Sequence, residues 1–191
     1  MAAPADGVAQ TARPWAADLL HTWFHTLRPS QWYGRNDGVD ALLRERFAHL
    51  TGPLSFRPAT EFLCDPDTAR AAILLFDQVP RNCFRDSPLA FAFDAIAREL
   101  SHGAIARGWH QGLPKGHAQF VLLPLMHSEH PADQRESLRR FAELGDPSNL
   151  RFARAHARMV FRFGRFPHRN AVLGRSSTPA ELRAIAAGNV W

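Results

Sequence analysis

The sequence predicts an all-α fold from three observations. Apolar residues recur at helical spacing along most of the chain, alternating strand patterns are absent, and several helix starts combine a capping residue with proline. We expect antiparallel helix hairpins stacked on one another. About eight helices are expected, at residues 15–27, 38–50, 66–78, 88–108, 116–127, 131–144, 148–163 and 179–187.

Apolar periodicity predicts the first two helices. Leu19 and Trp23 lie four residues apart on one face of the first, and Leu43 and Phe47 repeat the spacing in the second. The same pattern near the C-terminus places His156 on an apolar helix stripe, so we interpret it as a core or boundary residue rather than a ligand.

Three further helix starts carry capping signals. Asp65, Ser87 and Thr178 each stand directly before a proline, which is favourable at the first helical position. Glu181 follows Thr178 by three residues and completes a capping box.

Two segments, 76–88 and 163–179, share an order of features: an apolar helix end, proline, Arg-Asn, an apolar residue, arginine and a capped proline. We expect Pro80 and Pro167 to end their helices, because the residue before proline is pushed out of the α region. The two corners suggest a repeat-like stack.

Composition indicates one domain. The 191 residues are 46% hydrophobic and 21% charged, typical of a single globular unit. We expect a disordered N-terminal lead at 1–13 and one α-helical domain at 14–191.

Net charge and cysteine content limit which binding partners and which cellular compartment we expect. The net charge is +5, but the arginines are interspersed with acidic residues and form no visible basic stripe, so no nucleic-acid partner is expected. Cys64 and Cys83 do not make a disulfide framework, and the sequence lacks a signal-peptide core and a membrane-spanning stretch. We therefore expect a cytoplasmic protein that does not bind membranes. The oligomeric state is not predicted.

Polar side chains gather in three places. The first cluster follows an apolar run, the second lies in LLPLMHSEH (122–130), and the third follows the helix that ends near residue 163. The first cluster comprises Asp77, Gln78, Arg81, Asn82 and Arg85. The second comprises His127, Ser128 and Glu129. The third comprises Arg162, Arg165, His168, Arg169, Asn170 and Arg175.

The second cluster follows Pro124, which stands inside a helical pattern. A proline there removes a backbone hydrogen bond and kinks the helix. The kink would aim His127 and Glu129 into a cleft. Alternatively, Pro124 ends the helix early and these two side chains pair with neighbouring arginines.

Three motifs occur in the order DQVPRN (77–82), LPLMHSE (123–129) and FGRFPHRNAVLGR (163–175). They resemble the motifs of the bacterial family called domain of unknown function 924. The resemblance implies an α-helical fold similar to tetratricopeptide-repeat proteins and no established activity. The sequence departs from the family at Val79, where members usually have Phe, and at 51–63, which looks short and proline-interrupted.

The first functional hypothesis is an anion-binding pocket between helix hairpins. Arginines outnumber the acidic residues Asp77, Asp94 and Glu129 in the clusters, and a buried surplus of guanidinium groups would require an external anion. The ligand would be a small acid, a phosphorylated metabolite or a peptide carboxylate. The expected ligand-binding residues are Asp77, Arg81, Asn82, Arg85, Arg165, Arg169, Asn170 and Arg175. Alternatively, some of these arginines cap helix C-termini and reach solvent.

Two other hypotheses stay open. His127, Glu129 and His168 would supply acid–base catalysis to a hydrolytic enzyme, or less favourably bind a metal. The sequence has no HExxH, glycine-rich phosphate loop or GxSxG, so no metal or cofactor is expected. The third hypothesis is a protein-interaction scaffold in which the charged clusters form a purely structural ion-pair network.

Overall fold

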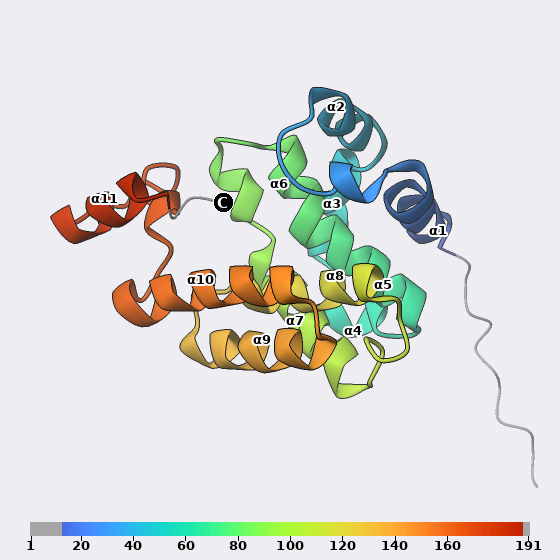
Figure 1. Ribbon diagram of the computed structural model, residues 1–191. Coiled ribbons are helices and arrows are strands. Elements are labelled where there is room, and N and C mark those ends of the chain that lie inside the picture. Colours follow the sequence, from blue (N-terminus) through green and yellow to red (C-terminus); the bar gives the residue numbers. More distant parts are fainter. Residues whose placement is uncertain (1–12, 189–191) are drawn as a thin grey trace, which may run out of the picture.

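The computed structural model describes residues 13–188. These residues form helices and turns and contain no strand, so the all-α prediction is confirmed (Figure 1). Apart from Arg13, the expected lead at 1–13 lies outside the described residues. The helices are α1 (Pro14–His21), α2 (Asp37–Arg46), α3 (Ala48–Ser55), α4 (Ala59–Phe62), α5 (Pro66–Ile73), α6 (Val79–Cys83), α7 (Asp94–Ala106), α8 (Lys115–Met126), α9 (Pro131–Leu144), α10 (Pro147–Phe163) and α11 (Pro179–Ala186).

The capping signals predict helix starts well. Asp65 accepts a hydrogen bond from the Thr68 amide at the start of α5. Thr178 and Glu181 form the expected capping box of α11. The hydroxyl of Ser87 accepts from the Leu89 amide, but there it starts a short 3-10 turn at 88–91 rather than the expected long helix.

Two expected helices are divided. The helix expected at 38–50 breaks at Phe47, which has non-helical dihedrals (φ −130°, ψ −21°) and separates α2 from α3. The helix expected at 88–108 begins as the 3-10 turn, and Phe93 (φ −107°, ψ 7°) separates that turn from α7. This second break makes Asp94 the first residue of α7, where a carboxylate is favourable.

The prediction that Pro80 ends its helix is wrong. A π-helical turn at 74–78 joins α5 to α6, and the Val79 amide donates to the Leu74 carbonyl, five residues back. Pro80 then lies in the first turn of α6, where its missing N–H costs little. The chain therefore stays helical through Asp77 and Arg81.

The prediction that Pro167 ends its helix is also wrong. α10 ends at Phe163, and the next residue, Gly164, adopts the left-handed conformation (φ 72°) that suits glycine. Pro167 instead opens a 3-10 turn at 167–169. The first segment stays helical through its Pro-Arg-Asn as far as Cys83, whereas in the second segment the same Pro-His-Arg-Asn region lies in a loop with a 3-10 turn. The two similar sequences are therefore not two copies of one corner.

Successive helices α7, α8, α9 and α10 each pack against the next, and α9 and α10 lie side by side in Figure 1. α1 packs on α5, and α2 packs on α6. One large core runs through these elements. Met159, Val160, Phe166 and Ala184 form a smaller second cluster, which holds the C-terminal segment against α10. Within residues 13–188, no helix has the length and apolar composition that crossing a bilayer requires.

Candidate functional site

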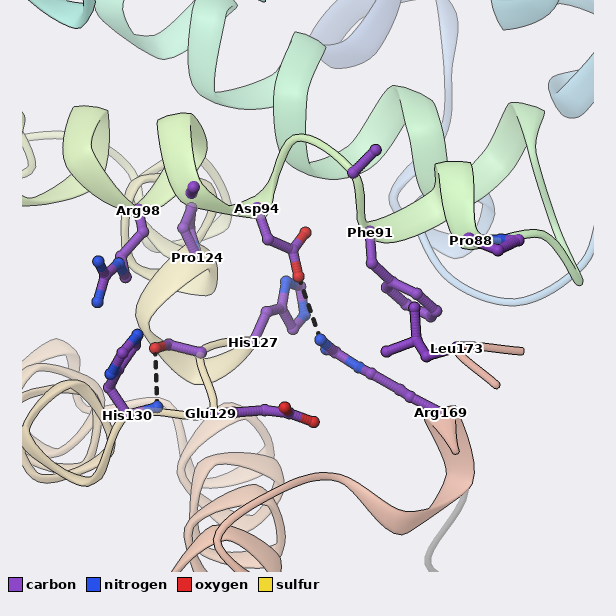
Figure 2. Close-up of a pocket in the computed structure, with 13 residues that line it drawn as sticks. Pro88, Phe91, Asp94, Arg98, Pro124, His127, Glu129, His130, Arg169 and Leu173 are labelled. Atoms are coloured by element: carbon purple, nitrogen blue, oxygen red, sulfur yellow. Dashed lines mark hydrogen bonds and ion pairs between the residues drawn. The ribbon is translucent and has the colours of Figure 1, made fainter. Parts of the chain in front are cut away.

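Two pockets meet at a wall formed by Phe91, His127 and Arg169. The large pocket has a volume of about 660 Å³ and the small pocket, drawn in Figure 2, about 310 Å³. Polar residues of the large pocket include Arg35, Gln78, Arg81, Asn82, Arg85, Asn149 and His156. Its apolar residues include Trp32, Tyr33, Leu123, Met126 and Phe152.

Asp94 brings the first and third sequence clusters together. Arg81, on α6, reaches its two carboxylate oxygens at 2.8 and 3.0 Å. Arg169, at the end of the 3-10 turn at 167–169, donates to the same group at 3.1 Å. Figure 2 shows Arg169 extending across the pocket to Asp94. The two arginines expected to share a site therefore lie side by side.

Aromatic rings hold Arg169. Its guanidinium lies 4.5 Å from the ring centroid of Phe91 and 4.5 Å from that of Phe166. The pKa of Arg169 is lowered to about 10, first by burial and then by the positive charge of Arg81. Its Nε is buried without a hydrogen-bond partner. Arg169 therefore has a carboxylate partner in Asp94 but keeps one N–H donor without a partner.

His127 follows the last residue of α8 and pairs with Asp77. Pro124 lies within α8 and does not end it. The His127 Nδ1 lies 2.7 Å from Asp77 Oδ1, and Asp77 also accepts from Gln78. Burial opposes ionisation of Asp77, but Arg81 and these hydrogen bonds outweigh it and hold the pKa of Asp77 well below its usual range.

The charge state of His127 follows from its surroundings. Burial lowers the pKa of His127 in spite of the Asp77 carboxylate, and Arg81 lowers it further. With the neutral imidazole donating from Nδ1 to an ionised Asp77, Nε2 is the basic nitrogen.

Glu129 does not pair with His127. It accepts two hydrogen bonds from Arg175, at 2.7 and 2.9 Å, and a third from the Phe166 amide at 2.8 Å. Burial would raise the pKa of Glu129, but these hydrogen bonds lower it overall. Glu129 borders the small pocket as an ionised group that also anchors the C-terminal segment.

The expected surplus of arginine over carboxylate is not found. Arg85 makes a two-pronged contact with Asp40, and Arg165 does the same with Glu181. Asp40 lies 45 residues before Arg85, and no local pattern marks the two as partners. All five arginines of the expected binding set thus have a carboxylate partner.

The remaining expected residues divide between the pocket and the layer behind it. Asn82 lines the large pocket and accepts from Arg85. Three others, His168, Asn170 and Arg165, line neither of the two pockets. Asn170 is fully buried and donates to the Ser177 hydroxyl. The pKa of His168 is lowered to about 4, mainly by burial and then by Arg169.

Sequence reasoning missed part of the site. His156 is buried, as expected, but it also lines the large pocket. Trp32 and Tyr33 come from a distant turn, and nothing local in the sequence distinguishes them from core aromatics. Among residues 13–188, no group of three or more His, Cys, Asp or Glu side chains is placed to hold a metal ion.

Comparisons with known proteins give family and fold. The sequence profile of a family described as "Bacterial protein of unknown function (DUF924)" matches residues 19–189. The structure of ATU0120, a protein of unknown function from Agrobacterium tumefaciens, is 34% identical in sequence, with a TM-score of 0.84. The match covers 91% of this chain and 97% of that one. No curated protein matches.

Proposed function

The chain belongs to DUF924, a family of bacterial proteins of unknown function, and we propose that it binds a small anionic molecule or a peptide carboxylate in its large pocket. One observation carries this proposal. Four arginines (Arg35, Arg81, Arg85 and Arg169) line that pocket, against the single acidic residue Asp86.

The carboxylate partners lie behind this lining. Asp40 and Asp77 are almost fully buried, and neither they nor Asp94 belong to the residues that line the large pocket. A molecule in the pocket therefore meets four guanidinium groups and the single carboxylate of Asp86. Planar guanidinium groups donate paired hydrogen bonds to carboxylate and phosphate oxygens.

The shape of the pocket indicates the rest of the ligand. A volume of about 660 Å³ suits a small molecule rather than a bare ion. Trp32, Phe91 and Phe152 supply apolar walls. The ligand has an anionic group beside Arg81 and Arg169 and an apolar or aromatic body. As part of the same proposal, the helix hairpins around the pocket are stacked in the manner of tetratricopeptide repeats.

Matched acid and amide probes test the proposal. We expect benzoate, phenyl phosphate and a hydrophobic tripeptide with a free C-terminus to bind in calorimetry, and benzamide and the amidated tripeptide not to bind. Arg35→Ala removes an exposed pocket arginine and should weaken acid binding several-fold, and Arg169→Lys by about tenfold. Arg57→Ala, outside the pocket, is the control. Equal binding of acids and amides would contradict the proposal.

A second candidate function, acid–base catalysis, is favoured by the 2.7 Å contact between Asp77 and His127. The ionised Asp77 orients the imidazole, and Nε2 would accept a proton from a molecule held by Arg81 and Arg169. Hydrolysis of p-nitrophenyl carboxylate or phosphate esters that is lost in His127→Gln, with the acid probes still bound, would support it. Activity retained in that variant would exclude His127 as the base.

A further inference from the structure

We propose that the groove between α9 and α10 binds an acidic amphipathic helix of a partner protein. The surface lies outside both pockets and is independent of the anion-binding proposal. It consists of an arginine stripe along α10, beside an apolar strip that α9 and α10 form together.

The stripe is a property of the folded helix. α10 contains four arginines and no acidic residue. At 100° per residue, the side chains fall within about 80° of one another around the helix axis. All are exposed, and none forms an ion pair within residues 13–188. The members are Arg151, Arg154, Arg158 and Arg162.

The neighbouring face of α9 differs. Its arginines Arg139 and Arg140 pair with Glu136 and Glu143 on the same helix. Those charges are satisfied internally, whereas the charges of α10 are not. The expectation that no basic stripe exists is therefore wrong, because residues that look dispersed in the linear sequence gather on one face of α10.

An apolar strip adjoins the arginines. Leu138 of α9 and Ala157 and Phe161 of α10 line a shallow depression of about 470 Å³, bordered by Arg154, Arg158 and Arg162. The Phe161 side chain is 49% exposed, so a partner could cover it. Arg135 of α9 lies over its ring at 5.6 Å. Cations thus flank an accessible apolar surface.

Charge and spacing indicate the occupant. Arg154, Arg158 and Arg162 repeat every four residues, or about 6 Å along the axis. Glutamates spaced four residues apart on a partner helix have the same repeat, and the apolar side chains beside them would cover Phe161 and Leu138. Single-stranded nucleic acid fits less well, because its binding surfaces offer aromatic faces on which bases stack. Here the guanidinium groups of Arg135, Arg151 and Arg162 lie over the rings of Phe161, Phe152 and Phe163.

The test compares four probes on the full chain by fluorescence anisotropy. They are a labelled amphipathic helix of about five turns with glutamates on one face and leucines beside them, polyglutamate, single-stranded DNA and anionic lipid vesicles. The variant Arg154→Glu/Arg158→Glu reverses the stripe. Arg57→Glu/Arg107→Glu makes the same change in net charge elsewhere. Phe161→Ser removes the apolar contact.

We expect the amphipathic peptide to bind best. The stripe reversal should weaken it at least tenfold and the control pair less than twofold, since local charge complementarity governs such contacts. Phe161→Ser should weaken the amphipathic peptide but not polyglutamate. Tighter binding of DNA or vesicles, equal binding of both peptides, or no binding at low salt would each overturn the proposal.

Discussion

The Arg169 side chain takes part in several interactions of the site at once. It is 5% exposed, lies between two aromatic rings and shares Asp94 with Arg81. A lysine at this position would keep the charge but lose the planar stacking and the fork of donors. The residue therefore serves packing and electrostatics together. Burial and the positive charge of Arg81 lower its pKa to about 10, although the Asp94 carboxylate favours the charged form.

His168 should make stability depend on pH. Its pKa is about 4 in the folded protein, below the ordinary histidine value near 6.5. The unfolded chain therefore binds the proton first, and stability falls as pH drops from about 6.5 towards 4. We expect His168→Gln to reduce the stability difference between pH 7.5 and pH 5, measured by urea unfolding, by on the order of 1–2 kcal/mol.

The exposed His49→Gln serves as a matched control for that comparison. His127 and His156 also have lowered pKa values, so part of the pH dependence should persist in His168→Gln. An unchanged profile in this variant would show that His168 titrates normally in the folded state.

The two thiols should differ in reactivity. Burial raises the pKa of Cys83 to about 11, whereas Cys64 is exposed. Because the thiolate is the reactive form, Ellman's reagent at pH 8 should modify one thiol per chain. The other thiol, that of Cys83, should react only after unfolding in guanidinium chloride. Rapid modification of both in native protein would mean that the region around α6 opens readily.

At the scale of elements, the segment after α10 is held by a small cluster and by ion pairs. Phe166 and Ala184 supply its buried apolar contacts, while Arg165–Glu181 and Arg175–Glu129 tie it to itself and to the loop after α8. Arg169 belongs to this segment. The wall between the two pockets thus depends on a part of the chain with little core of its own.

Thr178→Ala should loosen this segment locally. The change removes the capping-box acceptor of the eight-residue helix α11 and should cost about 1 kcal/mol. Hydrogen exchange should accelerate at α11 amides and remain unchanged in α5 and α8. Ser148→Ala, where Asp146 caps the helix instead, provides the control. Uniform acceleration across all helices would indicate global destabilisation.

Helix bounds were predicted correctly where the residues that set them lie close together in the sequence. α9 matches its expected bounds, and α11 starts at its predicted cap because Thr178 and Glu181 stand three residues apart in sequence. Pro80 misled the prediction because the π turn that accommodates it depends on buried packing on every side. Asp40 and Glu181 were not predicted as arginine partners, because they are distant in sequence. Asp40 lies 45 residues from Arg85, and Glu181 lies 16 residues from Arg165, so only the fold brings each pair together.

At the scale of the whole molecule, most of the stability comes from one core. Phe76 is fully buried in it, next to Phe62 and Phe93. Phe76→Ala should reduce the free energy of unfolding by about 3–5 kcal/mol in urea titration. Phe56→Ala, at a position that is 90% exposed, should change it by less than about 0.5 kcal/mol. Similar losses in both variants would contradict the assigned core.

The stacking of Arg169 between Phe91 and Phe166 has a spectroscopic consequence. Protons that lie over aromatic faces are shielded by ring currents, so the guanidinium protons of Arg169 should resonate well upfield of those of the exposed arginines. A molecule entering either pocket would disturb that stack. One natural resonance would then report occupancy of both pockets without any label.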